Sequence, residues 1–245
     1  AESGFDCEMM IQTYENDKLE QYGSAFSKNG YSGAIIGACS MKDQQWLESI
    51  SPRMPVALIN RPSEHFSSVC TDNEEAALMA AAKIRQKGYT EAAIFASSHA
   101  YYATNRRVQA FINSCEQLGI QIDEQYILKC PSTRNGGYGI GKQYASLTEP
   151  PKMIFCDSDA IALGALRAFH EKGISVPKDA EMLSIGMLDP EAASYYIPSL
   201  SVVEMPNKEI GQQVIRLLRK KILNNDPTPE HIDLHAKLIL RESFS

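Results

Sequence analysis

The sequence predicts an α/β protein built on parallel sheets. Short apolar runs of strand length recur along the chain, and stretches whose apolar residues have helical spacing follow most of them. The runs 33–39 and 55–60 are almost wholly apolar, which is typical of strands covered on both faces. The alternation of strands and helices therefore predicts parallel strands joined by right-handed crossovers.

The first expected elements are a strand over 5–13 and a helix over 15–29, in which Leu19, Tyr22 and Phe26 share one face. Further strands are expected at 33–39, 55–60, 67–71, 92–96, 126–130, 153–156, 182–187, 201–203 and 231–242. Further helices are expected at 41–50, 74–87, 103–118, from a glycine-rich loop at 135–141 to about 147, after 159, and at 207–223.

Composition narrows the class of protein. The net charge of −6 argues against these residues binding nucleic acid by themselves, because such binding needs a basic surface. The six cysteines are scattered and form no Cys-x-x-Cys pair, which favours buried free thiols in a reducing cytoplasm. No apolar run reaches the ~18 residues that cross a membrane. With no signal-peptide pattern either, we expect a cytoplasmic protein.

One stretch of the chain, 153–200, carries two polar turns that follow predicted strands. The strand at 153–156 runs into Asp157, Ser158 and Asp159, and the strand at 182–187 runs toward Asp189 and Pro190. Ligands of parallel α/β sheets bind at the carboxyl ends of the strands. The two turns therefore predict one wall of a binding pocket.

Seven short motifs in this order resemble one known family. They are Asp72-Asn73 before a helix, Arg107-x-x-x-Phe111, Asp159-x-x-Ala162-Leu163-Gly164-Ala165, Gly173-Ile-x-Val-Pro177-x-Asp179, Ser184-Ile-Gly186, Tyr196-Ile-Pro198-x-Leu200-Ser201 and Leu238-Ile-x-Leu-Arg241-Glu-Ser243. Each motif is weak alone, but together they span nearly the whole chain. The sequence is similar to the effector-binding core of the lactose/galactose-repressor family of bacterial transcription regulators.

This resemblance implies a fold like that of type I periplasmic sugar-binding proteins, with two parallel-sheet α/β subdomains joined by three crossover strands. The crossings would fall near Thr71, Glu204 and Glu230. It divides the chain into 1–71 with 205–229, and 72–204 with 230–245. It also implies a homodimer and operator DNA bound by a helix-turn-helix headpiece. Neither that headpiece nor the first strand and helix of the family core is found in the sequence, so we expect a fragment.

The resemblance places Arg107 where the family carries an arginine that binds sugar hydroxyls or acidic groups. A guanidinium presents five donors in a fixed fork, which suits paired oxygens. The alternative is a surface arginine on a helix, which is how we interpret its neighbour Arg106.

Other ligand contacts are implied by position. Asn60 ends a strand at the crevice and could donate and accept, although it could equally be a turn residue before Pro62. Ser158 matches a ligand-binding asparagine of several members and Asp157 is its neighbour, whereas helix capping would explain both. Asp159 we interpret as mainly structural.

Aromatic and apolar residues complete the expected site. Tyr101 and Tyr138 are candidate stacking surfaces for a sugar or a base, with peripheral packing as the alternative. Leu188 stands where many sugar-binding members carry an aspartate. That difference weakens the case for a simple sugar held in the usual way, and Leu188 could instead pack against an apolar part of the ligand.

Enzyme interpretations have no residue pattern behind them. The loop at 135–141 lacks dinucleotide-binding spacing, and no nucleophile elbow or P-loop occurs. His231, Asp233 and His235 share a face of a predicted strand, but a solvated edge explains them better than a metal site. We therefore expect no cofactor and no metal.

The function that these observations favour is sensing of a small effector, a sugar or sugar derivative, coupled to DNA affinity. The alternative is a solute-binding protein of a sugar transport system, which shares the fold. The missing signal pattern and the cysteines favour the regulator.

Overall fold

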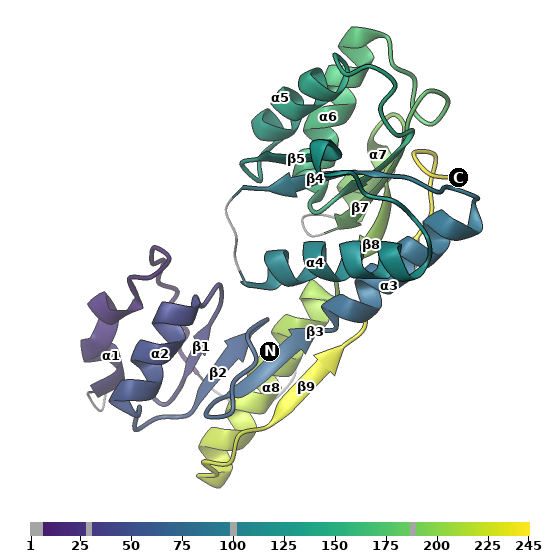
Figure 1. The fold of residues 1–245 in the computed structure, drawn as a ribbon. Coiled ribbons are helices and arrows are strands. Elements are labelled where there is room, and N and C mark those ends of the chain that lie inside the picture. The colour runs from purple at the N-terminus through teal and green to yellow at the C-terminus, as the bar shows by residue number, and fades with distance from the viewer. Residues whose placement is uncertain (1–6, 28–30, 99–101, 187–189) are drawn as a thin grey trace.

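The computed structural model describes residues 7–27, 31–98, 102–186 and 190–245. Its strands form two sheets that lie in separate lobes (Figure 1). The α/β class expected from the sequence, with two mainly parallel sheets, is confirmed. The carboxyl ends of β3 and β9 in the first sheet point toward the second lobe (Figure 1).

The first sheet has four parallel strands in the order β1-β2-β3-β9. Its strands are β1 (Ala34–Ile36), β2 (Val56–Ile59), β3 (Ser67–Thr71) and β9 (His231–Leu234). The lobe also contains the helices α2 (Met41–Ile50) and α8 (Asn207–Asn224). Helix α8 buries Ile210, Val214 and Leu217 against apolar side chains of the sheet, including Ala57 and Val69.

The second sheet has six strands in the order β10-β8-β7-β6-β4-β5, and only β10 is antiparallel to its neighbour. The strands are β4 (Ala93–Ser97), β5 (Ile127–Cys130), β6 (Met153–Cys156), β7 (Glu181–Gly186), β8 (Ser201–Glu204) and β10 (Lys237–Ile239). The helices of this lobe are α3 (Asn73–Gln86), α4 (Tyr102–Gln117), α5 (Arg134–Tyr144), α6 (Asp159–Lys172) and α7 (Pro190–Tyr195).

Apolar side chains fill both faces of the six-stranded sheet. On one face Phe155 of β6 stacks on Phe111 of α4, with ring centroids 3.8 Å apart. On the other face Phe95 of β4 makes edge contacts with Tyr144 and Phe169. A sheet covered on both faces has little free surface except at its strand ends, which is where polar groups can meet a ligand.

The chain changes sheet after β3, after β8 and again after β9. The last change comes later than the expected crossing near Glu230, because β9 pairs with β3 from Ser68↔His231 to Thr71↔Leu234. Residues 231–234 thus lie in the four-stranded sheet, whereas the expected boundary assigned them to the second subdomain. The subdomain boundaries themselves stay a prediction.

The strand expected over 5–13 is wrong for the part that is described. Residues 7–13 have no regular structure, and the side chains of Met9, Met10 and Ile11 are exposed, Ile11 to 85%. Strand formation needs a pairing partner as well as apolar residues, and this segment has none among the described strands. Of the expected helix over 15–29, the described residues up to 27 form a 3₁₀ turn (Leu19–Tyr22) and α1 (Gly23–Ser27).

The glycine-rich segment 135–141 is part of helix α5 rather than a loop. Thr133 caps the helix, its hydroxyl accepting from Gly136 N at 3.0 Å. A Cβ on Gly137 would lie 2.1 Å from the Ile161 carbonyl oxygen, and a Cβ on Gly164 would lie 1.9 Å from that of Arg134. The glycines therefore let α5 and α6 approach backbone to backbone, a tertiary requirement that overrides their low helix propensity.

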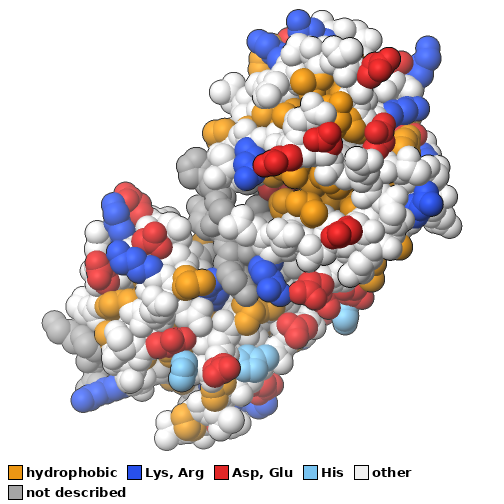
Figure 2. Space-filling model, in the orientation of Figure 1, with side chains coloured by type: hydrophobic (Ala, Val, Ile, Leu, Met, Phe, Trp, Pro, Cys, Tyr) orange, Lys and Arg blue, Asp and Glu red, His pale blue; other side chains and the backbone are white. Residues whose placement is uncertain are grey.

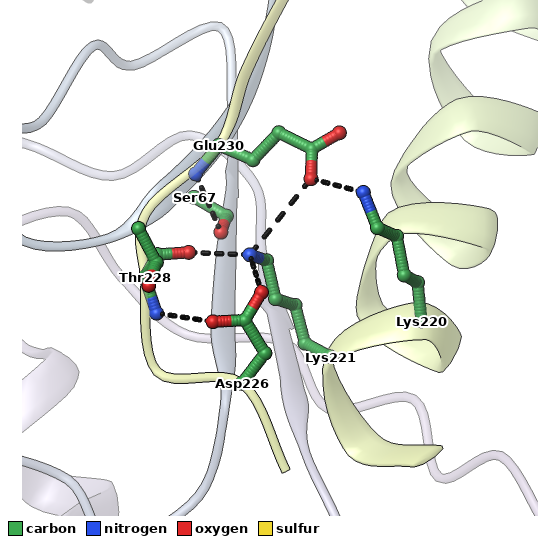
Figure 3. Close-up of polar contacts among 6 residues, drawn as sticks. All are labelled: Ser67, Lys220, Lys221, Asp226, Thr228 and Glu230. Atoms are coloured by element: carbon green, nitrogen blue, oxygen red, sulfur yellow. Dashed lines mark hydrogen bonds and ion pairs between the residues drawn. The ribbon is translucent and has the colours of Figure 1, made fainter. Parts of the chain in front are cut away.

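A buried lysine ties the end of α8 to the strand edge beyond it (Figure 3). Lys221 donates to Asp226 Oδ2 at 2.8 Å and to the Thr228 carbonyl, while Lys220 donates to Glu230 Oε2 at 2.7 Å. The Glu230 amide in turn donates to Ser67 Oγ, just before β9. This cluster of residues 220–230 fixes the connector between α8 and β9, because a buried ammonium is stable only when its donors are satisfied.

Candidate functional site

The carboxyl ends of β4 and β6 are joined by Asp157. Its amide donates to the Phe95 carbonyl at 3.0 Å, and its Oδ2 accepts from Ser97 N at 2.7 Å. Two bonds to the neighbouring strand fix the side chain at the edge of the sheet. Asp157 is only 1% exposed, so the sequence places a carboxylate in the interior at the point where ligands of parallel sheets bind.

Arg107, in α4, is the second buried charge at this edge, 3% exposed. Its neighbour Arg106 is exposed and pairs with Glu74 at 2.7 Å. Arg106 therefore fits the surface interpretation, and Arg107 does not; the role of Arg107 as a ligand contact stays a prediction. Burial lowers the pKa of the Arg107 guanidinium, and the negative charge of Asp157 opposes that change.

Asp157 is electrostatically coupled to Arg107. Burial raises the pKa of the Asp157 carboxyl, and the Ser97 amide and the Arg107 charge only partly offset it. Its Oδ1 is buried and accepts no hydrogen bond from the described residues. The edge therefore holds one cation, one anion and an acceptor atom to which a ligand could donate a hydrogen bond.

Ser158 and Asp159 cap helix α6. Ser158 is the N-cap and its hydroxyl accepts from Ala160 N, to which Asp159 Oδ1 also binds, at 3.0 Å. Both contacts go to the Ala160 amide in the first turn of the helix, which is the capping alternative weighed from the sequence. Asp159 also lines the cavity described below.

Asn60 holds the turn at the end of β2. It lies in the left-handed region, with φ at 52°, and its Oδ1 accepts from Thr71 N at 3.0 Å. The turn role is therefore visible in the structure, and the oxygen that could accept from a ligand is already engaged. Its role as a ligand contact stays a prediction.

The other candidate residues are not brought to this edge by any described contact. Tyr138 lies within α5, and its hydroxyl donates to Glu171 Oε2 of α6 at 2.6 Å, with Lys142 over its ring. This is the peripheral packing that was the alternative to a stacking role. Tyr101 and Leu188 lie outside the described residues.

A cavity of about 680 Å³ opens between the lobes. Asp159 lines it, whereas Asp157, two residues earlier, and Arg107 are not among its lining residues. One wall is the strand edge of the second sheet, with Asp159, Gly186 and Glu204. The other is the polar side of α8, which carries Gln212 and Arg216. The space-filling view shows charged side chains of both signs where the lobes meet (Figure 2).

Sequence reasoning did not find the α8 wall of the cavity. A signal was present, because Ile210, Val214 and Leu217 form an apolar stripe and Gln212, Gln213 and Arg216 fall on other faces. What the sequence could not give is the position of α8, which packs on the first sheet and faces strand ends of the second sheet across the cavity.

Comparisons with known proteins decide the family. A model of the periplasmic binding protein-like domain family matches residues 81–244. The HTH-type transcriptional repressor PurR of Escherichia coli is 28% identical over 234 residues, 94% of this chain and 68% of the repressor. A LacI family transcription regulator from Clostridium acetobutylicum is 32% identical with a TM-score of 0.89, over 93% of this chain and 84% of that one. The chain belongs to the LacI family.

This LacI-family chain is the ligand-binding core of a transcription regulator and not an enzyme, which sets the transport alternative aside. A LacI family regulator from Enterococcus faecalis V583 with bound ribose shares its fold, with a TM-score of 0.77 and 20% identity. The alignment covers 93% of this chain and 83% of that one.

The structure also bears on the metal site and the membrane-spanning helix considered from the sequence. In the described part of the chain, no cluster of three His, Cys, Asp or Glu side chains could hold a metal ion. His231 contacts Ser68 and His235 contacts Glu75, so the two histidines have different partners. None of the described helices has the length and apolarity needed to span a membrane.

Proposed function

We propose that this LacI-family core binds a sugar or sugar derivative in the cavity between the lobes and couples that binding to DNA affinity. Burial of Arg107 and Asp157 carries the proposal, with Asp157 at the carboxyl end of β6 and only two residues before Asp159, which lines the cavity. Sugar recognition needs donors and acceptors fixed in position, and a guanidinium with a neighbouring carboxylate provides both. The cavity volume lies in the range of small-molecule sites.

The ribose bound by the Enterococcus faecalis regulator supports a sugar of this general class. We extend only the class to this chain. Leu188 in place of an aspartate, expected from the sequence, points to a ligand with an apolar portion. Tyr101 remains a proposed stacking surface, and Asn60, Ser158 and Tyr138 are proposed at most as indirect supports, since each has an internal partner.

The cavity's two walls come from different lobes, so ligand binding can be coupled to the arrangement of the lobes. A ligand that contacts both walls stabilises the arrangement in which they fit it, and so shifts the population of lobe arrangements. In our proposal the chain acts in the cytoplasm as a homodimer, with a helix-turn-helix headpiece outside these 245 residues contacting operator DNA. The charge of −6 agrees with a DNA contact made elsewhere.

The experiment is a thermal-shift screen against mono- and disaccharides, phosphosugars and nucleosides, followed by calorimetric titration of the best compound. Arg107→Ala should weaken its binding at least about tenfold, since one charge-assisted hydrogen bond is worth roughly 1.5–3 kcal/mol. Arg106→Ala is the matched control, because that side chain is exposed and pairs with Glu74. Equal affinity in wild type and Arg107→Ala would move the site elsewhere.

A further inference from the structure

The strand edge of the second sheet carries two interior charges of opposite sign, and they affect one another. We propose that Asp157 sets the charge class of the ligand. Its carboxylate compensates the Arg107 guanidinium, so the site accepts uncharged molecules that offer O–H or N–H groups and excludes phosphates and carboxylates. This inference rests on the proposed ligand site and names its specificity-determining residue.

Asp157 cannot move away from this position without breaking main-chain contacts. Its amide and its Oδ2 both bind β4, at Phe95 and Ser97. It follows directly on buried Cys156, which packs in the sheet interior. The negative charge is therefore built into the edge of the sheet, rather than carried by a side chain that a ligand could push aside.

The Oδ1 atom of Asp157 indicates that a ligand must provide a hydrogen-bond donor. It is buried and accepts no hydrogen bond from any side chain or amide in the described ranges. A buried acceptor left without a donor is unfavourable, and a ligand hydroxyl or N–H would remove that cost. An anionic group offers acceptors instead, so it would leave Oδ1 unpaired and bring like charge next to it.

Arg107 alone would favour the opposite class of ligand. A buried guanidinium attracts phosphate and sulfate strongly, because its planar fork matches two of their oxygens. With Asp157 ionised, the field of the pair is close to neutral, and an approaching anion is repelled about as much as it is attracted. Removing the carboxylate charge should therefore turn the same place into an anion site.

Sulfate is the probe, and Asp157→Asn is the variant. Asparagine keeps the shape and an oxygen that can accept from Ser97 N, and it removes the charge. Sulfate binding is measured by thermal shift and calorimetry at constant ionic strength, with sodium chloride as the balancing salt. We expect Asp157→Asn to bind sulfate at least about tenfold more tightly than wild type.

The double variant Arg107→Gln/Asp157→Asn identifies where the anion sits and controls for the general stabilising effect of sulfate. In this double variant the sulfate affinity should fall back to that of the wild type. If Asp157→Asn binds sulfate no better than wild type, or if the gain persists in the double variant, the inference is wrong. The sugar screen is read separately: a sulfate gain without any sugar binding would contradict the proposed function and leave the exclusion of anions standing.

Wild-type protein at decreasing pH provides a measurement that needs no Asp157 variant. The titratable groups described around Asp157 are Arg107 of α4, Cys130 of β5 and Cys156 of β6. Burial raises the pKa of both thiols, Cys130 to about 11, so they stay neutral, and Arg107 stays charged. Protonation of Asp157 should therefore raise sulfate affinity as the pH falls, and Arg107→Gln should abolish that rise. A wild-type sulfate affinity that does not change with pH would contradict the inference.

Discussion

Asn60 stabilises a turn through both its backbone conformation and its side chain. Its φ is positive and its Oδ1 binds the Thr71 amide at the end of β3. Asn60→Ala should lower the free energy of unfolding by about 2 kcal/mol, from a strained φ and an unpaired buried amide. Chemical denaturation would measure it.

Asn60→Asp is the matched control for this turn, because it keeps the oxygen and tolerates positive φ. It should lose much less stability than Asn60→Ala. If both variants are equally stable, the side-chain bond to Thr71 does not hold the turn.

Lys221 is the most deeply buried ammonium among the described residues, 4% exposed, with Asp226 and the Thr228 carbonyl as partners. Lys221→Met should destabilise the protein by roughly 1.5–3 kcal/mol, because it removes the charge-assisted hydrogen bonds that the buried ammonium donates. Lys220→Met, one residue earlier and exposed, should have a much smaller effect, and equilibrium unfolding in urea compares the two. Similar losses in both variants would rule out a special role for the buried amine.

The same cluster predicts a dependence of stability on pH. The Lys221 ammonium and the Thr228 amide hold the pKa of Asp226 at about 2, below its ordinary value. A carboxyl with a lowered folded-state pKa stabilises the fold above the unfolded pKa of ~3.9 and loses that contribution as the pH falls toward 2. Asp226→Asn should therefore flatten the decline in unfolding free energy between about pH 4 and 2. An unchanged slope in that variant would mean that Asp226 makes no such contribution.

The sequence indicated candidate residues but not the partners that the fold gives them. Arg107 was separable from Arg106 only through a family motif, because helical periodicity alone cannot say which of two adjacent arginines is interior. The internal partner of Tyr138 was likewise not visible in the sequence. Its residue type suits a stacking surface, but its partner Glu171 is 33 positions away in the sequence and on another helix.

Among the elements, the packing of α5 on α6 makes the sharpest prediction. Gly164→Ala should destabilise the protein by about 3 kcal/mol, because the added methyl meets the Arg134 carbonyl and the Tyr138 amide. Gly139→Ala, in the same helix pair, has open space around its Cβ and should gain up to about 1 kcal/mol through helix propensity. Thermal unfolding distinguishes the two signs, and a loss of stability in both variants would point to a general intolerance of the helix pair.

Most strands and helices were predictable, since apolar periodicity marks α2, β3 and β6 with their observed bounds. The failures share a cause. The segment 5–13 has the residues of a strand without a neighbour to pair with, and 135–141 has the residues of a loop with a neighbouring helix to fit. In both cases the deciding interaction lies outside the segment.

For the whole molecule, ligand binding should protect both lobes at once. Hydrogen exchange should slow at the ends of β7 and β8 in one lobe and in the first turns of α8 in the other, because residues of these elements line the cavity. The compound from the thermal-shift screen would be used, with Arg107→Ala as the variant that should lose the protection. Protection confined to one lobe would mean that the ligand does not bridge the cavity.

The order of strands within each sheet was beyond the sequence. Nothing in the pattern at 231–242 says that its first half pairs with β3 and its second half with β8. The division follows from which edges are open once the other strands have assembled. The family resemblance supplied the general topology, whereas the chain's own residues specified only the elements.

Helix α8 has a mechanical consequence. Its first turns form a cavity wall, and its last turn begins at Lys221, which binds the connector beyond the helix. At 1.5 Å per residue its 18 residues span about 27 Å. A tilt of about 10° at the cavity would therefore displace the far end by about 5 Å. A ligand that tilted the cavity end of α8 would therefore strain the cluster around Lys221, which holds the other end of the helix to the connector before β9.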